Sequence, residues 1–262
     1  MMTGMSSGRG TGKRMPLSLP DWHKRYHQQA EWTRSIRLHI LQQLKLDSSA
    51  KGLEVGCGTG AILTDLYKQG YQNLLGVDIQ LQTLEYAIQG NMTSPLICAN
   101  GLSLPFAPQY FDFIYCHYLL MWLKDPHRAL LEMKRVVKPG GVILLFAEPD
   151  YGGHIAHPAE LERIVNLQVQ SLRTQGVDVQ VGRKLQQLLL EIGLEEIQSG
   201  IIGAEWSQAS SNLQSELEMI QSDLEFITTR RDASLAYLQS RQWQGMVYFI
   251  PTFYAFGRVS NV

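Results

Sequence analysis

The chain has 262 residues, which is enough for one large domain or two small ones. Hydrophobic residues make up 45% and charged residues 18%, an apolar content that permits a packed core and excludes disorder over most of the length. The 23 Lys and Arg against 24 Asp and Glu give a net charge of -1. Since nucleic-acid binders usually carry a basic excess, we expect no nucleic-acid partner.

The chain has three cysteines, Cys57, Cys98 and Cys116. They are too few and too scattered for a disulfide framework or a zinc knuckle, and we expect them to be packing residues. The longest apolar run, Val142 to Ala147, is far too short to span a membrane, and residues 1–20 contain no apolar segment typical of a signal peptide. His154 and His157 have a spacing seen in some metal sites, but Pro158 interrupts the helix that would present them. We therefore expect a cytoplasmic protein without a metal.

Residues 1–20 are rich in glycine, serine and basic side chains and are expected to form a flexible tail ahead of a single domain over 21–262. One helix is predicted over residues 21–46, with Arg34 and Arg37 outside its apolar stripe. The stripe consists of Trp32, Ile36, Ile40 and Leu44. The same helix carries a run of tryptophan, histidine and tyrosine, which is consistent with packing on the core or with covering a ligand.

A repeated alternation of strand and helix begins at residue 53. Strands are predicted over Leu53–Val55, Asn73–Val77, Pro95–Ala99, Phe111–Cys116 and Val142–Ala147. Helices are predicted over Ala61–Lys68, over Gln80–Gln89 and from Pro126 to the breaker Lys138-Pro139-Gly140-Gly141. This alternation predicts an α/β fold with a doubly wound, Rossmann-like sheet that is mostly parallel.

After Pro149 the alternation changes character. Helices are predicted over Pro158–Thr174, Gly182–Ile192 and Gln208–Gln242, and strands over Glu195–Ala204 and Met246–Val259. Pro251 lies within the last segment and predicts an edge, a bulge or a strand end. We expect the final strand to be antiparallel, and two helical insertions, about 155–192 and 208–242, to cover the cleft.

Three glycines, Gly56, Gly58 and Gly60, follow the first predicted strand and precede a helix. Glycines let the backbone turn sharply and let a ligand approach without a Cβ in the way. The helix that follows directs free N–H groups and a partial positive charge at that ligand. With Ala61 the spacing also matches the dinucleotide fingerprint G-x-G-x-x-A, so spacing alone does not separate NAD from other adenosine ligands.

The charges around this loop do separate them. Glu54 lies two residues before the first glycine, and no Arg or Lys follows until Lys68. A pyrophosphate would add two negative charges there, whereas S-adenosylmethionine carries a sulfonium and an ammonium that Glu54 would attract. Asp78, at the end of the second strand, suits a ribose diol in either ligand. Asn100 and Gly101 either offer an amide to adenine or form an Asn-Gly turn.

Five segments in this order resemble the class I S-adenosylmethionine-dependent methyltransferases, in particular the small-molecule type-11 group that includes quinone-biosynthesis enzymes. They are Leu53 to Gly60, Gly76-Val77-Asp78, Asn100 to Phe106, Phe111-Asp112-Phe113-Ile114 and Lys138-Pro139-Gly140-Gly141. The resemblance covers about residues 53–147, and the combination is far more specific than any single segment.

The resemblance implies that the glycine loop holds the methionine part of the cofactor and that Asp78 grips the ribose. At Asn100 the family usually has Asp, which bonds the adenine amino group, and an Asn can accept that bond through its carbonyl. The stretch Cys116-His117-Tyr118 would run under the methionine end. The residues expected to bind S-adenosylmethionine are Glu54, Gly56, Cys57, Gly58, Thr59, Gly60, Asp78, Ile79, Asn100, Gly101, Leu102 and Cys116.

Methyl transfer is an in-line displacement at an activated carbon, so alignment of donor and acceptor dominates, and a base is required only when the nucleophile is protonated with a high pKa. Candidate catalytic residues follow the fourth and fifth strands, where clefts open in such sheets. They are His117, Glu148, Asp150 and Tyr151. For each, a loop hydrogen bond or a helix cap is the structural alternative.

Aromatic side chains near the end of the chain suit either an apolar pocket or a core. They are Trp206, Trp243, Tyr248, Phe249, Phe253 and Tyr254. We expect a methyltransferase that acts at O, N or C of a small, apolar or aromatic molecule. Two alternatives stay open, an NAD-type oxidoreductase and a non-catalytic module that binds S-adenosylmethionine. The sequence leaves the acceptor and the oligomeric state open.

Overall fold

The computed structural model describes residues 18–203 and 245–261. Its α-helices are α1 (Leu19–Trp32), α2 (Arg34–Leu44), α3 (Ala61–Lys68), α4 (Leu81–Gln89), α5 (Pro126–Val136), α6 (Ala159–Thr174) and α7 (Leu185–Glu191). Short 3-10 turns are η1 (Leu120–Trp122), η2 (Tyr151–Gly153) and η3 (Gly182–Lys184). The strands are β1 (Gly52–Val55), β2 (Leu74–Asp78), β3 (Leu96–Cys98), β4 (Phe111–Cys116), β5 (Val137–Pro149), β6 (Ile155–His157), β7 (Glu195–Ile202), β8 (Val247–Phe249) and β9 (Thr252–Arg258).

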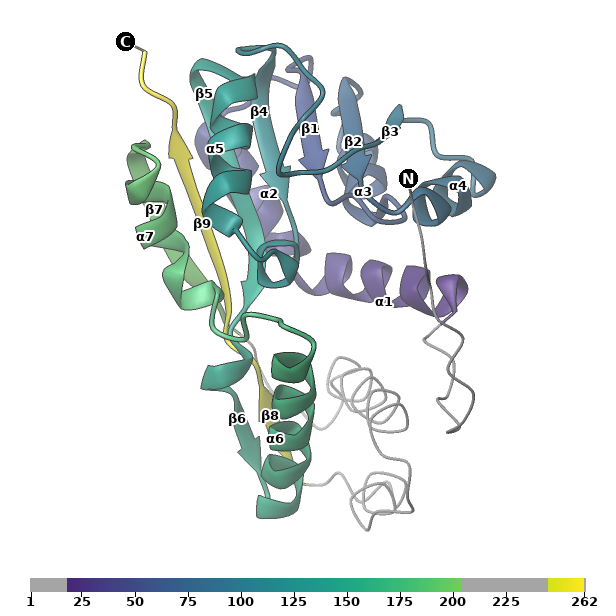
Figure 1. Ribbon diagram of the computed structural model, residues 1–262, viewed down its shortest axis with the longest axis vertical. Helices are drawn as coiled ribbons and strands as arrows, with labels where there is room; N and C mark the ends of the chain where they lie inside the picture. Colours follow the sequence, from purple (N-terminus) through teal and green to yellow (C-terminus); the bar gives the residue numbers. More distant parts are fainter. Residues whose placement is uncertain (1–17, 204–244, 262) are drawn as a thin grey trace, which may run out of the picture.

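Seven of these strands form one sheet in the order β3-β2-β1-β4-β5-β9-β7 (Figure 1). Strands β1 to β5 pair in parallel, and β9 runs antiparallel to both β5 and β7. The order reverses between β1 and β4, which is the switch point where ligands bind in open α/β sheets. The predicted α/β class, mostly parallel with an antiparallel final strand, is confirmed.

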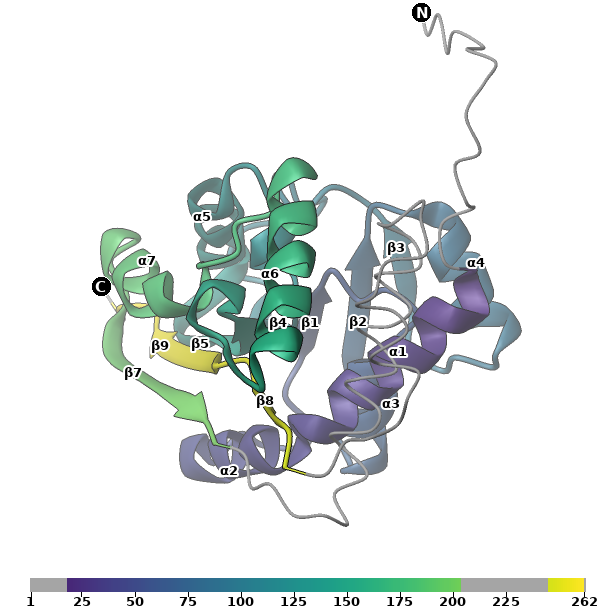
Figure 2. The same ribbon diagram turned by 90° about the horizontal axis from the view of Figure 1, so that it is seen from below.

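Helices cover both faces of this sheet, as Figure 2 shows from below. On one face, α2, α3 and α4 enclose a core with apolar side chains such as Phe113, Tyr115 and Phe146. On the other face, α5, α6 and α7 pack on a core that includes Val55, Ile114 and further strand residues. Because successive side chains of a strand point to opposite faces, each central strand contributes to both cores.

The N-terminal helix differs from its prediction in three ways. It begins at Leu19, where Ser18 and Asp21 form a capping box, so residues 18–20 belong to the helix and not to a tail. It also breaks at Thr33, which separates α1 from α2. Finally, Arg37 is fully buried, although the helical stripe predicted it on an outer face. Its guanidinium finds buried polar partners, which the apolar periodicity of the sequence does not register.

The predicted strands Val142–Ala147 and Met246–Val259 have different limits in the structure. Helix α5 ends at Val136, before the Lys138-Pro139-Gly140-Gly141 segment, which then forms part of the long strand β5 with a register shift against β4. The predicted last strand is divided into β8 and β9 on either side of Pro251, because proline has no N–H to give to a ladder. The strand end expected at Pro251 is confirmed.

A smaller unit follows β5. Strand β6, which the sequence pattern did not indicate, pairs antiparallel with β8, and α6 packs beside them (Figure 1). The predicted insertion at 155–192 thus contains β6 and α6, with η3 and α7 at its end. The predicted insertion at 208–242, with the aromatic residues Trp206 and Trp243, lies outside the described residues. Among the described helices, none is long and apolar enough to cross a bilayer.

Candidate functional site

The glycine loop after β1 is tied to the end of β2. The backbone N–H groups of Gly56 and Cys57 donate to the carbonyl oxygen of Val77 at 2.7 and 3.0 Å. The φ angles of Gly56, Gly58 and Gly60 are +76°, +51° and +79°, values that L side chains rarely adopt. A Cβ on Gly60 would lie 2.1 Å from Cε of Met92. The loop therefore requires glycine for both its backbone conformation and its close packing.

Asp78 connects this loop to the second strand. Its Oδ2 accepts from the N–H of Gly58 at 2.8 Å, and its Oδ1 accepts from the N–H of Gln80 at 2.9 Å. The side chain is partly exposed, and a carboxylate has lone pairs for further hydroxyl donors. Ile79 beside it is 64% exposed, so an apolar surface adjoins the carboxylate. This arrangement is suited to a ribose with its attached base, and both residues stay predicted contacts.

The loop after β3 approaches the same place. The N–H of Ala99 donates to the carbonyl oxygen of Asp78, and a Cβ on Gly101 would lie 2.9 Å from Cγ1 of Val55. Asn100 is exposed, and its Oδ1 accepts from the N–H of Leu102 at 2.9 Å. The local turn anticipated as an alternative at this position is therefore present. Because that turn engages the carbonyl oxygen, the Asn100 side chain has its amide N–H₂ to offer to an adenine edge.

Glu54 does not lie at the open edge of the sheet. It is 2% exposed and points to the face covered by α2 and α3, where it pairs in register with Tyr115. Burial raises the pKa of this carboxyl well above its ordinary value, against the opposing influence of Tyr115 and the positive charge of Arg37. Its Oε2 is buried and has no hydrogen-bond partner within the described residues. A buried, unpartnered carboxyl oxygen is a costly feature that a cationic ligand would relieve.

Helix α1 crosses over the glycine loop, as Figure 2 shows. Nδ1 of His23 lies 2.9 Å from Oγ1 of Thr59, and a Cβ on Gly58 would lie 3.0 Å from the ring of Tyr26. Burial and the nearby charge of Asp78 raise the pKa of Tyr26 to about 12. Helix α1 therefore packs on the core through Ala30 and also contacts the glycine loop, and its covering of a ligand stays a prediction. The sequence offered the clustered aromatic and histidine side chains as the only signal.

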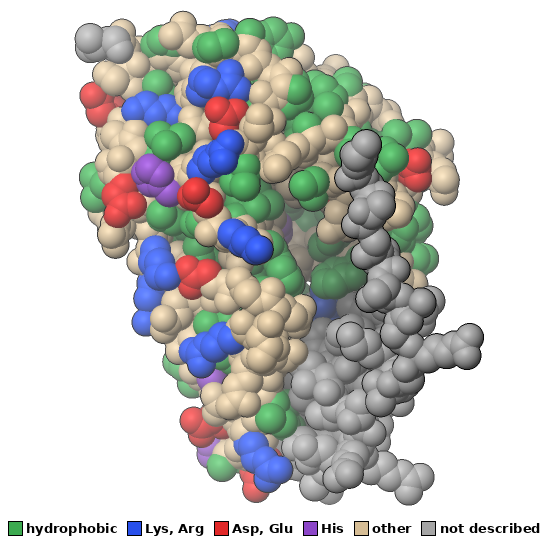
Figure 3. All heavy atoms as spheres, viewed as in Figure 1, with side chains coloured by type: hydrophobic (Ala, Val, Ile, Leu, Met, Phe, Trp, Pro, Cys, Tyr) green, Lys and Arg blue, Asp and Glu red, His purple; other side chains and the backbone are tan. Residues whose placement is uncertain are grey.

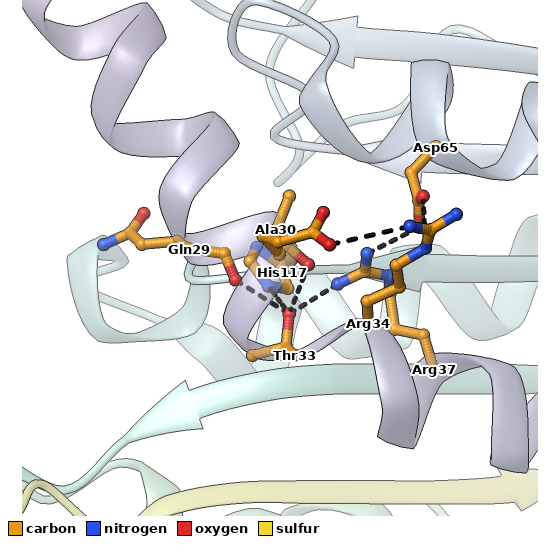
Figure 4. Close-up of polar contacts among 8 residues, drawn as sticks. Gln29, Ala30, Thr33, Arg34, Arg37, Asp65 and His117 are labelled. Atoms are coloured by element: carbon orange, nitrogen blue, oxygen red, sulfur yellow. Dashed lines mark hydrogen bonds and ion pairs between the residues drawn. The ribbon is translucent and has the colours of Figure 1, made fainter. Parts of the chain in front are cut away.

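A buried polar network joins the α1–α2 junction to the end of β4 (Figure 4). Oγ1 of Thr33 lies 2.8 Å from Nε2 of His117, and Arg37 donates to the same oxygen. The other terminal nitrogen of Arg37 donates to Oδ2 of Asp65 at 2.6 Å, and Arg34 lies 3.2 Å from Oδ1 of that carboxylate. The sequence analysis did not identify Thr33, Arg37 and Asp65 as site residues. The one signal was that Arg37 stands four residues before Leu41, on the same face of the helix, which indicates that Arg37 is buried as well.

This network also corrects the charge argument made from the sequence. No basic residue follows Glu54 along the chain until Lys68, but folding brings Arg37 from α2 close enough to influence the pKa of that carboxyl. Because the Arg37 guanidinium is paired with Asp65, the two charges largely offset each other. The carboxyls of Glu54 and Asp78 therefore still give the loop its acidic character.

Glu148 is fully buried at the end of β5, and three backbone N–H groups surround its carboxyl. Oε1 accepts from Leu119 and Leu120 at 2.8 Å each, and Oε2 accepts from Met121 at 3.4 Å. Burial raises its pKa to about 7, although these donors oppose the rise. The carboxyl thus caps η1, the turn that follows β4. Glu148 therefore has the capping role that was the structural alternative to catalysis. A catalytic role for Glu148 stays a prediction.

Asp150 and Tyr151 lie on the side of the smaller unit. Asp150 is 1% exposed and pairs with Arg183, which donates from two nitrogens. Tyr151 begins η2 and is packed against the main core, while its carbonyl oxygen lies 2.9 Å from Nδ1 of His154. An aspartate fully engaged with arginine is poorly suited to accept a proton. Asp150 is thus held by Arg183 and Tyr151 packs on the core, and a catalytic role for either residue stays a prediction.

The three cysteines have different surroundings. Cys57 in the glycine loop and Cys116 at the end of β4 are buried, and burial raises the pKa of both thiols well above the ordinary value. Sγ of Cys116 lies 3.9 Å from Oε1 of Glu148. Cys98 is exposed, so its expected role as a packing residue is wrong. In the described part of the chain, no group of three or more His, Cys, Asp and Glu is placed to hold a metal ion.

Comparison with known proteins bears on this cluster of loops at the carboxyl edge of β1 to β4. Residues 53–145 match a family described as methyltransferase domain. Over 109 residues the chain is 35% identical to a demethylmenaquinone methyltransferase of Corynebacterium urealyticum, which is 42% of this chain and 46% of that protein. Over 146 residues it is 33% identical to an uncharacterized methyltransferase of Schizosaccharomyces pombe, which is 51% of this chain and 52% of that protein.

Residues 53–145 form a methyltransferase domain. The chain spans about half the length of these two relatives. Among solved structures, phosphoethanolamine N-methyltransferase 2 of Haemonchus contortus in complex with S-adenosylmethionine has a TM-score of 0.58 at 14% identity, over 94% of this chain and 61% of that chain, which is a likeness of fold. The resemblance to class I methyltransferases is confirmed.

The ligand named for the Haemonchus contortus structure is S-adenosylmethionine. The residues present fit it, because the glycine loop provides a cradle that a Cβ would fill and Glu54 has a buried oxygen without a partner. A sulfonium or ammonium near that oxygen would favour the ionised carboxylate. The individual contacts of Glu54, Asp78 and Asn100 stay predictions.

Proposed function

We propose that this protein transfers the methyl group of S-adenosylmethionine to O, N or C of a small, apolar or aromatic molecule. One observation supports this most directly. The positive-φ glycine loop is bonded to Asp78, and it directly follows Glu54, whose buried Oε2 has no hydrogen-bond partner within the described residues. Together they suit a ligand that combines a ribose with positive charge.

A dinucleotide is a poorer match to this loop. Its pyrophosphate would need a compensating cation, and the nearest buried cation, Arg37, is already bonded to Thr33 and Asp65. On the face drawn in Figure 3, Lys and Arg are interspersed with Asp and Glu and form no separate basic patch. The charges therefore favour the methyl donor over NAD.

In the proposed mechanism, S-adenosylmethionine supplies a methyl group already activated by its sulfonium. The glycine loop and Asp78 would orient the cofactor, and α1, through His23 and Tyr26, would exclude water from the loop. Glu148 would act indirectly, because its carboxyl fixes the turn of Leu119 to Met121 beside the loop. Orientation of this kind supplies much of the rate enhancement in a displacement reaction.

The acceptor is proposed from the side chains beyond β4 and β9. Tyr248 is buried and Phe253 is partly buried against the same core, so the described part of this region is apolar. Such a surface suits an apolar or aromatic molecule. We propose a small-molecule acceptor and a cytoplasmic location, without a nucleic-acid partner.

Isothermal titration with S-adenosylhomocysteine and with NAD would test the cofactor assignment. We expect binding of the former and none of the latter, and the reverse would refute the proposal. Transfer of a labelled methyl group to a panel of phenols, amines and enols would then test catalysis. Cofactor binding without transfer to any member of the panel would favour a binding module instead.

A further inference from the structure

The end of β4 lies beside the glycine loop. Tyr115 pairs with Glu54 across β4 and β1, and His117 directly follows Cys116, the last residue of β4. Leu119 packs so closely there that a Cβ on Gly56 would lie 2.7 Å from its Cδ1. His117 therefore stands at the edge where the methyl-bearing part of the cofactor is expected.

Counting protons fixes the state of the His117 ring. Thr33 donates its single hydroxyl proton to the carbonyl oxygen of Gln29 at 2.9 Å. The Arg37 guanidinium, which has only donors, also bonds to the Thr33 oxygen. With the hydroxyl proton assigned to Gln29, the threonine oxygen accepts at its 2.8 Å contact with His117 Nε2, which assigns the ring proton to Nε2. A neutral His117 then has its lone pair on Nδ1.

The surroundings of His117 keep the ring neutral. Its pKa is lowered well below the ordinary value by burial and by the positive charge of Arg37. The other charged or titratable groups beside it are Asp65, which is paired with Arg37, and Tyr118, whose ring centroid is 4.8 Å from that of His117. Within the described residues, Nδ1 makes no hydrogen bond, and it is not among the fully buried unpartnered atoms. The His117 residue is half-buried, so it keeps some exposure to solvent.

We propose that Thr33 and Arg37 are positioning residues that hold His117 as the Nε2–H tautomer, so that Nδ1 is the base that takes the acceptor's proton. This inference rests on the proposed function and names its substrate class. As the acceptor oxygen forms its bond to the methyl carbon, the carbon–sulfur electron pair stays on sulfur and the O–H proton moves to Nδ1. The imidazolium that results keeps its Nε2–H bond to Thr33 and later releases the proton to water.

The acceptor class follows from the strength of this base. An imidazole whose protonated form is disfavoured is a weak base, and general-base catalysis works best when the two pKa values are not far apart. A phenol, with a pKa of about 10, is within reach, whereas an alkyl alcohol ionises about as reluctantly as water. The site therefore selects acceptors with a phenolic or enolic hydroxyl.

Nitrogen-15 NMR of histidine-labelled protein tests the tautomer without any substrate. We expect His117, assigned by its absence in His117→Gln, to show a protonated Nε2 and a bare Nδ1 at pH 7. Thr33→Val removes the accepting oxygen and should abolish the preference for Nε2–H, while Thr33→Ser restores it. The matched control is Thr83→Val, which removes a buried threonine hydroxyl in α4 that bonds to Gln80. A protonated Nδ1 in the unaltered protein would overturn the proposal.

Kinetics test the role of the base. With 2-naphthol as acceptor, His117→Gln keeps a donor toward Thr33 but has no base, so we expect the rate to fall about 100-fold with unchanged binding of S-adenosylhomocysteine. Thr33→Val should lower the rate about 10-fold and change its pH profile, whereas Thr83→Val should do neither. Equal rates with decahydro-2-naphthol, or a full rate in His117→Gln, would refute the base and its acceptor class.

The two proposals fail in different ways. If S-adenosylhomocysteine does not bind, the proposed function is wrong while the tautomer result stands. If it binds and methyl groups are transferred, but His117 has its proton on Nδ1, only this inference is wrong.

Discussion

The two halves of the carboxyl edge treat their acidic side chains differently. Beside β1 and β2, Glu54 has an unpartnered oxygen and Asp78 accepts only backbone bonds within its own loops. Beyond β5, Glu148 is surrounded by three N–H groups and Asp150 is held by Arg183. The first half has binding capacity left for a ligand, while the second has used its carboxylates to fix loops.

This difference indicates that the carboxylates beside β1 and β2 serve ligand binding, whereas those beyond β5 stabilise loops. Candidate acids beyond β5 were attractive from their position after strands, but satisfied carboxylates make poor acids and bases. His117, which follows β4, has a hydrogen-bond contact at Nε2 and none at Nδ1 within the described residues. The comparison predicts that changes near β1 and β2 alter affinity, and that changes at Glu148 alter stability.

The largest effect is expected at the glycine loop. Gly58→Val places a branched side chain at φ +51° and against the Tyr26 ring, so the affinity for S-adenosylhomocysteine should fall about 1000-fold in calorimetry, equivalent to about 4 kcal/mol. Gly176→Val is the control, because Gly176 has φ +83° and nothing within 4 Å of an added Cβ. Unchanged affinity in Gly58→Val would mean that the ligand lies elsewhere.

Stability should depend on pH through Glu148. Its pKa is about 7 in the folded protein and 4.5 ordinarily, so its contribution is complete below pH 4.5 and is lost as pH rises through 7. The free energy of unfolding should fall by about 3 kcal/mol over that range, at 1.36 kcal/mol per pKa unit.

Urea unfolding of the unaltered protein and Glu148→Gln at several pH values would measure this contribution. In Glu148→Gln, the decrease in the free energy of unfolding between pH 4.5 and 7 should be smaller by this amount. Glu160→Gln, at an exposed position in α6, should keep the full decrease. The same pH dependence of unfolding in all three proteins would show that the pKa of Glu148 does not differ between the folded and unfolded states.

The ribose assignment predicts a smaller change. Asp78→Ala removes two acceptors for ribose hydroxyls, which should weaken S-adenosylhomocysteine binding about 30-fold, or about 2 kcal/mol. Asp125→Ala is the matched control, since Asp125 also accepts from a backbone N–H but does so at the start of α5. Equal affinities for the two variants would contradict the assignment.

The smallest effect is expected at Glu54. Burial raises the pKa of this carboxyl and a nearby cation lowers it, so binding of S-adenosylmethionine should release protons. Calorimetry in buffers of different ionisation enthalpy would count them. Glu54→Gln should abolish the release and weaken binding about 10-fold. Release that persists in Glu54→Gln would place the titrating group elsewhere.

Much of this architecture was accessible from local sequence. The alternation of apolar runs with helical periods, together with Gly56, Gly58 and Asp78, predicted the sheet and its ligand edge, because strand ends and positive-φ glycines are short-range features. The resemblance in residues 53–147 extended this to a methyltransferase, and the family that matches residues 53–145 confirmed it.

The rest depended on contacts between distant segments. The break at Thr33, the burial of Arg37 and the bond from Thr33 to His117 join positions 84 residues apart, and no periodicity reports a polar group that is buried because it has found partners. Likewise, Glu148 and Asp150 were located by sequence, but only folding showed that backbone N–H groups and Arg183 engage them. The sequence determined which residues follow the carboxyl ends of the strands. The tertiary structure decided which of their side chains have atoms without a hydrogen-bond partner, because those partners come from distant segments.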